Sequence, residues 1–63
     1  MRDWKVGDVL EVMDDRPKRP GGRKPPFRKG QMVVIQNLHP EAGVGLQRHG
    51  GYWDFKRFEV RRG

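Results

Sequence analysis

The chain has 63 residues, a formal charge of +6 at neutral pH and no cysteine. This length holds one domain with one small core, and without cysteine there are neither disulfides nor thiolate zinc ligands. The chain also lacks serine and threonine, which excludes covalent catalysis through their hydroxyls or a thiol and leaves only Lys, Tyr, His or a carboxylate as a nucleophile. A chain this short also struggles to build a pocket that excludes water. We therefore expect a non-enzymatic protein with a single domain over residues 1–63 and with no cofactor or metal.

No apolar run reaches the length that a membrane span needs, and no signal-type segment follows Met1. These features favour a soluble, cytoplasmic protein with no membrane partner. The surplus of positive charge makes phosphate-rich molecules the expected partners.

The first predicted strand covers residues 9–13. Alternation places Leu10 and Val12 on one side and the remaining residues on the other, which is typical of a half-buried strand. Asp14-Asp15 should end the strand and balance the charge of Arg16.

A basic segment follows over residues 16–29. It holds seven of the 14 Lys and Arg residues, four of the five prolines and no acid. Proline fixes φ and lacks an amide donor, while the Gly21-Gly22 pair turns freely. The segment therefore forms neither a regular helix nor an interior strand. We expect a flexible, exposed loop over about residues 14–29.

The chain after this loop is rich in short β segments. The strongest contains Val33-Val34-Ile35, three consecutive β-branched residues. A tight hairpin turn is expected at Gly50-Gly51, where both residues tolerate a positive φ. The predicted elements are strands over residues 31–38, 44–48, 52–55 and 59–61, with a turn of 3₁₀ helix over residues 56–58. The predicted class is all-β.

Three parts of the chain resemble small SH3-like barrel proteins of phages and prophages. They are Val6-Gly-Asp8-Val-Leu-Glu-Val12, Phe27-Arg-Lys-Gly30, and Gly51-Tyr-Trp53 together with Arg57-Phe-Glu59. The resemblance implies a small five-stranded SH3-like barrel in which the last strand pairs with the first. The long basic loop between the first two strands is then an expansion of a connection that is usually shorter. The resemblance implies nothing about activity.

The aromatic residues divide between core and surface. Alternation puts Trp53 and Phe55 on one side of their strand and Tyr52 on the other. We expect that pair to join Phe58 in the core and Tyr52 to be exposed, where its ring can stack on a base. The other aromatic residues should cover an end of the barrel: Trp4 and Phe27.

The basic loop predicts binding of DNA or RNA through the phosphate backbone. Sequence specificity should be low, because nothing in the chain resembles a reading helix or a code for base edges. A second basic group, Lys56-Arg57 with Arg61-Arg62, would add to the interface if it shares a face with the loop. The candidate nucleic-acid-binding residues are Arg16, Lys18, Arg19, Arg23, Lys24, Arg28, Lys29, Tyr52, Lys56 and Arg57.

Other interpretations of the same sequence stay open. A protein-interaction module that docks onto a host protein or assembly would fit the fold equally well, and so would a virion component, a homo-oligomer or a loop that only solubilises the protein. Pro17-Lys-Arg-Pro20 has the spacing of polyproline ligands. Gly22-Arg-Lys-Pro25 resembles the Gly-Arg-Pro core of an AT-hook, with Lys24 inserted. His39 and His49 are expected in surface turns.

Overall fold

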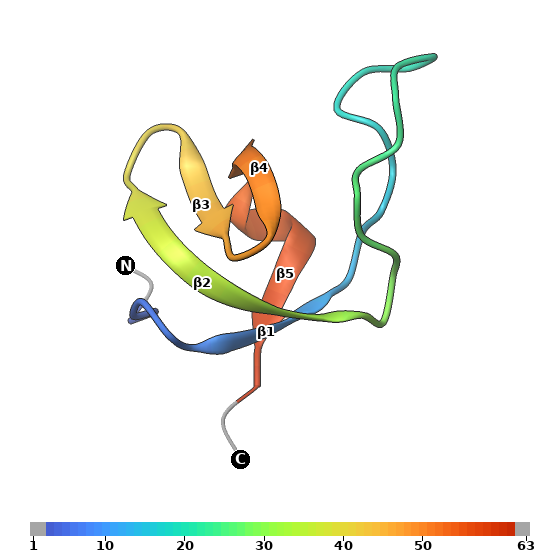
Figure 1. Ribbon diagram of the computed structural model, residues 1–63. Coiled ribbons are helices and arrows are strands. Elements are labelled where there is room, and N and C mark those ends of the chain that lie inside the picture. Colours follow the sequence, from blue (N-terminus) through green and yellow to red (C-terminus); the bar gives the residue numbers. More distant parts are fainter. Residues whose placement is uncertain (1–2, 62–63) are drawn as a thin grey trace.

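The computed structural model describes residues 3–61. Its elements, in chain order, are β1 (Val9–Val12), β2 (Met32–His39), β3 (Gly43–Leu46), β4 (His49–Trp53), the 3₁₀ helix η1 (Phe55–Arg57) and β5 (Phe58–Val60). The five strands form one antiparallel sheet in the order β4-β3-β2-β1-β5. The predicted all-β class is confirmed, and the basic segment leaves the sheet between β1 and β2 (Figure 1).

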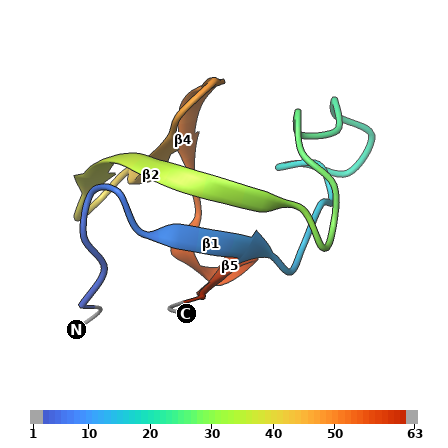
Figure 2. The ribbon, with the colours of Figure 1, turned by 60° about the horizontal axis from the view of Figure 1, so that its bottom comes forward.

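Strand β2, eight residues long, is the centre of the sheet. Its first half pairs with β1 and its second half with β3, and the register shifts between Ile35 and Asn37. Such a bulge bends a strand and increases its twist. The strand order places β1 and β5 on one side of β2, and β3 and β4 on the other (Figure 2).

The last strand pairs with the first, as expected, and Glu59 of β5 lies opposite Glu11 of β1. Two glutamates in that position repel each other, but Arg61 lies 2.7 Å from Glu11 and 3.4 Å from Glu59. The strand order ends at β4 and at β5. Over residues 3–61 the sheet is therefore open.

One cluster of buried apolar side chains forms the core. In β1 the predicted alternation is confirmed, since Leu10 and Val12 are fully buried while Val9 is exposed. The same alternation in β2 and β3 directs branched side chains inward. The buried core residues are Leu10, Val12, Phe27, Val33, Ile35, Val44, Leu46 and Phe58.

The predicted hairpin turn at Gly50-Gly51 is wrong. The turn lies at residues 47–48, where Arg48 has a φ of 69°, and both glycines belong to β4. A turn centred on Gly50-Gly51 would place Val44 opposite Arg57, whereas the observed register pairs Val44 with Trp53. The observed pairing places the Trp53 ring beside the buried Val44. The register of β4 shifts between His49 and Tyr52, where the two glycines lie.

The prediction for the aromatic core holds in part. Phe58 is buried, but Trp53 and Phe55 are half-buried and pack against the cluster. The strand ends at Trp53 and Phe55 begins η1, so the alternation of β4 does not extend to Phe55. Phe27, expected to cover a barrel end, is instead a core residue that is 2% exposed. Trp4 is half-buried with its ring edge-on to Phe55, at a centroid distance of 5.7 Å.

Candidate functional site

The loop over residues 14–29, which contains the basic segment, is called the arm from here on. It leaves the sheet after β1, projects away from it, and folds back before it returns to β2 (Figures 1 and 2). At its first end, Arg57 Nη1 donates to the backbone oxygens of Asp14, at 3.3 Å, and of Arg16. The amides of Met13 and Asp14 donate in return to the Arg57 carbonyl at 2.7 and 3.2 Å. The start of the arm is therefore bonded to η1.

Phe27 anchors the other end of the arm. Its ring lies edge-on to Trp53 and Phe58, at centroid distances of 5.0 and 5.3 Å, and Pro25 beside it is also buried. The amide of Lys29 donates to the Asp15 carboxylate at 3.1 Å, which joins the two branches of the arm at its base. Both ends of the arm are thus held by the fold.

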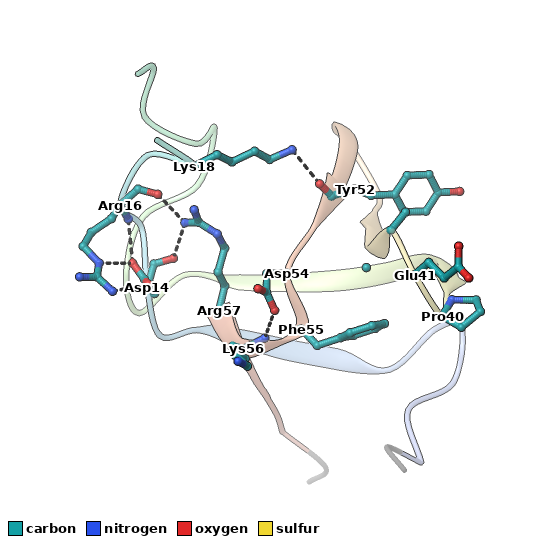
Figure 3. Close-up of a pocket in the computed structure, with 12 residues that line it drawn as sticks. Asp14, Arg16, Lys18, Pro40, Glu41, Tyr52, Asp54, Phe55, Lys56 and Arg57 are labelled. Carbon is teal, nitrogen blue, oxygen red and sulfur yellow. Dashed lines mark hydrogen bonds and ion pairs between the residues drawn. The ribbon is translucent and has the colours of Figure 1, made fainter. Parts of the chain in front are cut away.

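Lys18 forms a third attachment. Its ammonium donates to the Tyr52 carbonyl at 2.9 Å and lies 4.3 Å from the centre of the Trp53 ring. An ammonium over an aromatic face is attracted by the ring quadrupole. The contact connects the arm to β4 across 34 residues of sequence (Figure 3). Lys18 is exposed and has three N–H donors, so it keeps donors for a ligand.

Arg16 is neutralised locally. Its Nε and Nη2 donate to the two oxygens of Asp14 at 3.1 and 3.0 Å. These bonds, with one from the Arg16 amide, hold the pKa of Asp14 at about 2 and raise the pKa of Arg16. The expectation that Asp14 balances the charge of Arg16 is confirmed.

The Asp14 carboxyl should therefore titrate near pH 2 rather than near its usual 3.8. The contact with Arg16 lowers the pKa of Asp14 in the folded state, so it stabilises the arm fully at pH values above the ordinary aspartate pKa of 3.8. This stabilisation is lost as the pH falls through about 2. The Cγ chemical shift of Asp14, followed by NMR, measures this. Arg16→Gln should move the midpoint upward and Arg19→Gln should leave it unchanged. A wild-type midpoint near 3.8 would contradict the contact.

Five cations of the arm are exposed and have no side-chain hydrogen bond or ion pair within residues 3–61. A turn closed by the bond from the Gly22 amide to the Arg19 carbonyl, at 3.0 Å, forms the tip. Gly21 within it has a φ of 77°, which glycine adopts without strain. The five cations are Arg19, Arg23, Lys24, Arg28 and Lys29.

The described members of the second basic group, Lys56, Arg57 and Arg61, do not form one exposed patch of unpaired cations. Lys56 is exposed beside the base of the arm, but Arg57 is only 8% exposed and donates to the arm backbone. Arg57, predicted as a nucleic-acid ligand, thus lies buried, and its Nη1 is already bonded to the arm. Arg61 is paired with glutamates of β1 and β5, and Arg62 lies outside the described residues. Only Lys56 thus adds an unpaired charge near the arm among the described members of the group.

Tyr52 is half-buried rather than exposed. Its hydroxyl accepts a hydrogen bond from Asn37 Nδ2 at 2.9 Å, and its ring lies edge-on to His39 at 5.8 Å. The ring is therefore fixed in orientation. His39 lies at the end of β2, where its Nδ1 accepts from two turn amides. His49 lies in β4 rather than in a turn.

An open groove of about 740 Å³ runs along the base of the arm. Its lining comes from three segments: the base of the arm, the turn between β2 and β3, and the chain from Tyr52 to Arg57. Figure 3 places Arg16 and Lys18 on one side of this groove and Pro40 and Glu41 on the other. The sequence alone gave no indication that Glu41 and Asp54 would face the basic segment.

Comparison of the chain with protein-family models, with curated proteins and with solved structures finds no match. Within residues 3–61, no helix is long and apolar enough to cross a membrane. In the same part of the chain, no three His, Asp or Glu side chains lie close enough together to hold a metal ion. The exposed cations of the arm and the groove beside them are thus the candidate site.

Proposed function

We propose that this protein is a small, non-enzymatic nucleic-acid-binding protein that contacts the phosphate backbone through its arm. The observation that carries the proposal is the set of five exposed arm cations that the described fold leaves unpaired. Lysine and arginine that neutralise phosphates release condensed counterions, and this release drives binding irrespective of sequence. Cations already paired with carboxylates, such as Arg16 and Arg61, contribute less because their charge is compensated.

The attachment of the arm at both ends supports the same function. A free basic tail loses conformational entropy when it binds, whereas a segment held at both ends has lost part of it already. Phe27, Lys18 and Arg57 hold the arm at three points. The cations at its tip are thus presented away from the sheet, where a polyanion can reach them.

The proposed specificity is low. Over residues 3–61 the only helix is the three-residue η1, which is too short to lie in a major groove and read base edges. Arginine and lysine that contact phosphates set position and affinity rather than sequence preference. Affinity should therefore depend on charge and salt far more than on the order of bases.

We further propose that the fold is a small SH3-like barrel of the type found in phages and prophages. The pairing of the last strand with the first and the 3₁₀ turn before it support this assignment. The position of the arm, between the first two strands, supports it as well.

Replacing Arg19, Arg23 and Lys24 by alanine should lower the affinity for a fluorescent 20-nucleotide strand on the order of 100-fold at low salt, because three phosphate contacts are lost. Fluorescence anisotropy measures the change. The matched control removes three cations outside the arm with Arg2→Ala, Lys5→Ala and Arg48→Gly, and leaves the paired Arg61 in place. Glycine at position 48 keeps the positive φ of 69° accessible.

The control variant has the same net charge as the arm variant and should bind nearly as well as the wild type. An equal loss in both variants would mean that net charge, and not the arm, drives binding. Absence of binding by the wild type at low salt would refute the proposed function itself.

A further inference from the structure

The groove beside the arm carries charges of both signs, unlike the arm itself. Lys18 and Lys56 line it together with Glu41 and Asp54. One oxygen of Asp54 accepts the Lys56 amide at 2.9 Å, and no bond of the Glu41 carboxylate is found within residues 3–61. Carboxylates accept hydrogen bonds and donate none. The groove therefore suits a ligand that brings N–H donors as well as a negative charge.

A duplex presents mainly phosphates and sugars to a surface of this kind. The carboxylates of Glu41 and Asp54 would repel those phosphates, since like charges at short distance are unfavourable. An unpaired base differs, because its amino and imino groups are free to donate to a carboxylate. The mixed charge of the groove thus favours a single strand over a duplex.

The aromatic side chains of the groove point to the same ligand. The rings of Tyr52 and Phe55 lie toward the side of Pro40 and Glu41, opposite Lys18 (Figure 3). Both rings are half-buried, and the hydroxyl of Tyr52 is held by Asn37. Unstacked bases pack on fixed aromatic side chains with little regard to their identity. The volume of about 740 Å³ lies within the range of roughly 300–1,000 Å³ that ligand pockets occupy.

Lys18 supplies the phosphate contact that this ligand needs. One N–H of its ammonium is bonded to the Tyr52 carbonyl. The contact of the ammonium with the Trp53 ring also holds the ammonium in place. The remaining donors lie at the edge of the groove, at the point where the arm begins. A strand that follows the arm cations would reach Lys18 before it enters the groove.

We propose that the groove binds an unstacked base of a single-stranded nucleic acid while Lys18 binds an adjacent phosphate. The inference rests on the proposed function, since the arm supplies most of the affinity. It adds a preference for single strands that the arm alone does not predict. The groove and the arm can therefore be tested separately.

The test compares three ligands at one salt concentration: a mixed-sequence 15-nucleotide strand, the same backbone without bases, and the corresponding duplex. Wild-type protein should bind the strand with bases about 5- to 150-fold more tightly than the abasic strand, the range that stacking contacts provide. It should also bind that strand more tightly than the duplex. Fluorescence anisotropy gives all three affinities.

Two variants locate the preference. Tyr52→Leu removes a ring and Glu41→Ala removes an acceptor in an exposed turn, and each should reduce the preference for bases. Tyr52→Leu should leave the affinity for the abasic strand unchanged. Glu41→Ala should not lower that affinity, because it removes a carboxylate that repels phosphates. Tyr52→Phe keeps the ring and is the matched control. A thermal melt of each variant verifies folding, and the exposed position of Glu41 keeps the test valid if Tyr52→Leu unfolds.

The outcomes separate the two proposals. Equal binding of all three ligands by the wild type would overturn the groove proposal and leave the arm proposal intact. A preference for bases that both variants retain would also overturn it, and would leave the groove to another occupant such as a peptide. No binding to any ligand would refute the proposed function as well.

Discussion

Phe27→Ala should remove most of the folding stability of this protein. The side chain is 2% exposed and touches the rings of Trp53, Phe58 and His49. Truncating a buried phenylalanine costs about 3–5 kcal/mol through lost burial and the cavity left behind. At about 0.05–0.15 kcal/mol per residue, a chain of 63 residues has only about 3–9 kcal/mol in total. Urea denaturation followed by tryptophan fluorescence measures the loss.

Two controls accompany this variant. Phe27→Leu keeps most of the apolar volume and should lose clearly less stability. Met32→Ala removes a side chain that is 53% exposed and should have little effect. If Phe27→Ala were as stable as the wild type, Phe27 would not be a core residue and the arm would lack its second anchor.

The sequence predicted the strands well because their signals are local. Alternation in β1 and the run of β-branched residues in β2 depend on neighbouring side chains alone. The turn of the β3–β4 hairpin was misplaced because two positions competed for it. The glycine pair satisfies a local rule, but the pairing of Val44 with Trp53 depends on the core, and the core decided the register.

The candidate site was harder to predict because its contacts join distant parts of the chain. Arg57 resembles any other basic residue in the sequence, and its acceptors are backbone oxygens 43 and 41 residues away. Lys18 likewise finds its acceptor 34 residues further along the chain. A charge pattern identifies which residues are cationic and does not tell which of them the fold has already paired. The Asp14–Arg16 pair was predictable because its partners are two residues apart.

The affinity of this protein for a single strand should fall steeply with salt. If the five exposed arm cations each neutralise one phosphate, and the Lys18 contact at the groove is left aside, the slope of log K against log salt is about −3.5. Raising the salt from about 50 to about 200 mM should then weaken binding roughly 130-fold. The electrostatic contribution is lost because counterion release becomes less favourable as bulk salt rises.

The most direct test of the phosphate-binding role of the arm is the slope of that salt titration. It is compared between the wild type and the variant with Arg19, Arg23 and Lys24 replaced by alanine. With two phosphate contacts left, the slope should flatten to about −1.4, and the same change of salt should weaken binding only about sevenfold. The variant with Arg2→Ala, Lys5→Ala and Arg48→Gly should keep the steep wild-type slope. Equal slopes for the wild type and the arm variant would contradict the proposal that the exposed arm cations bind phosphate.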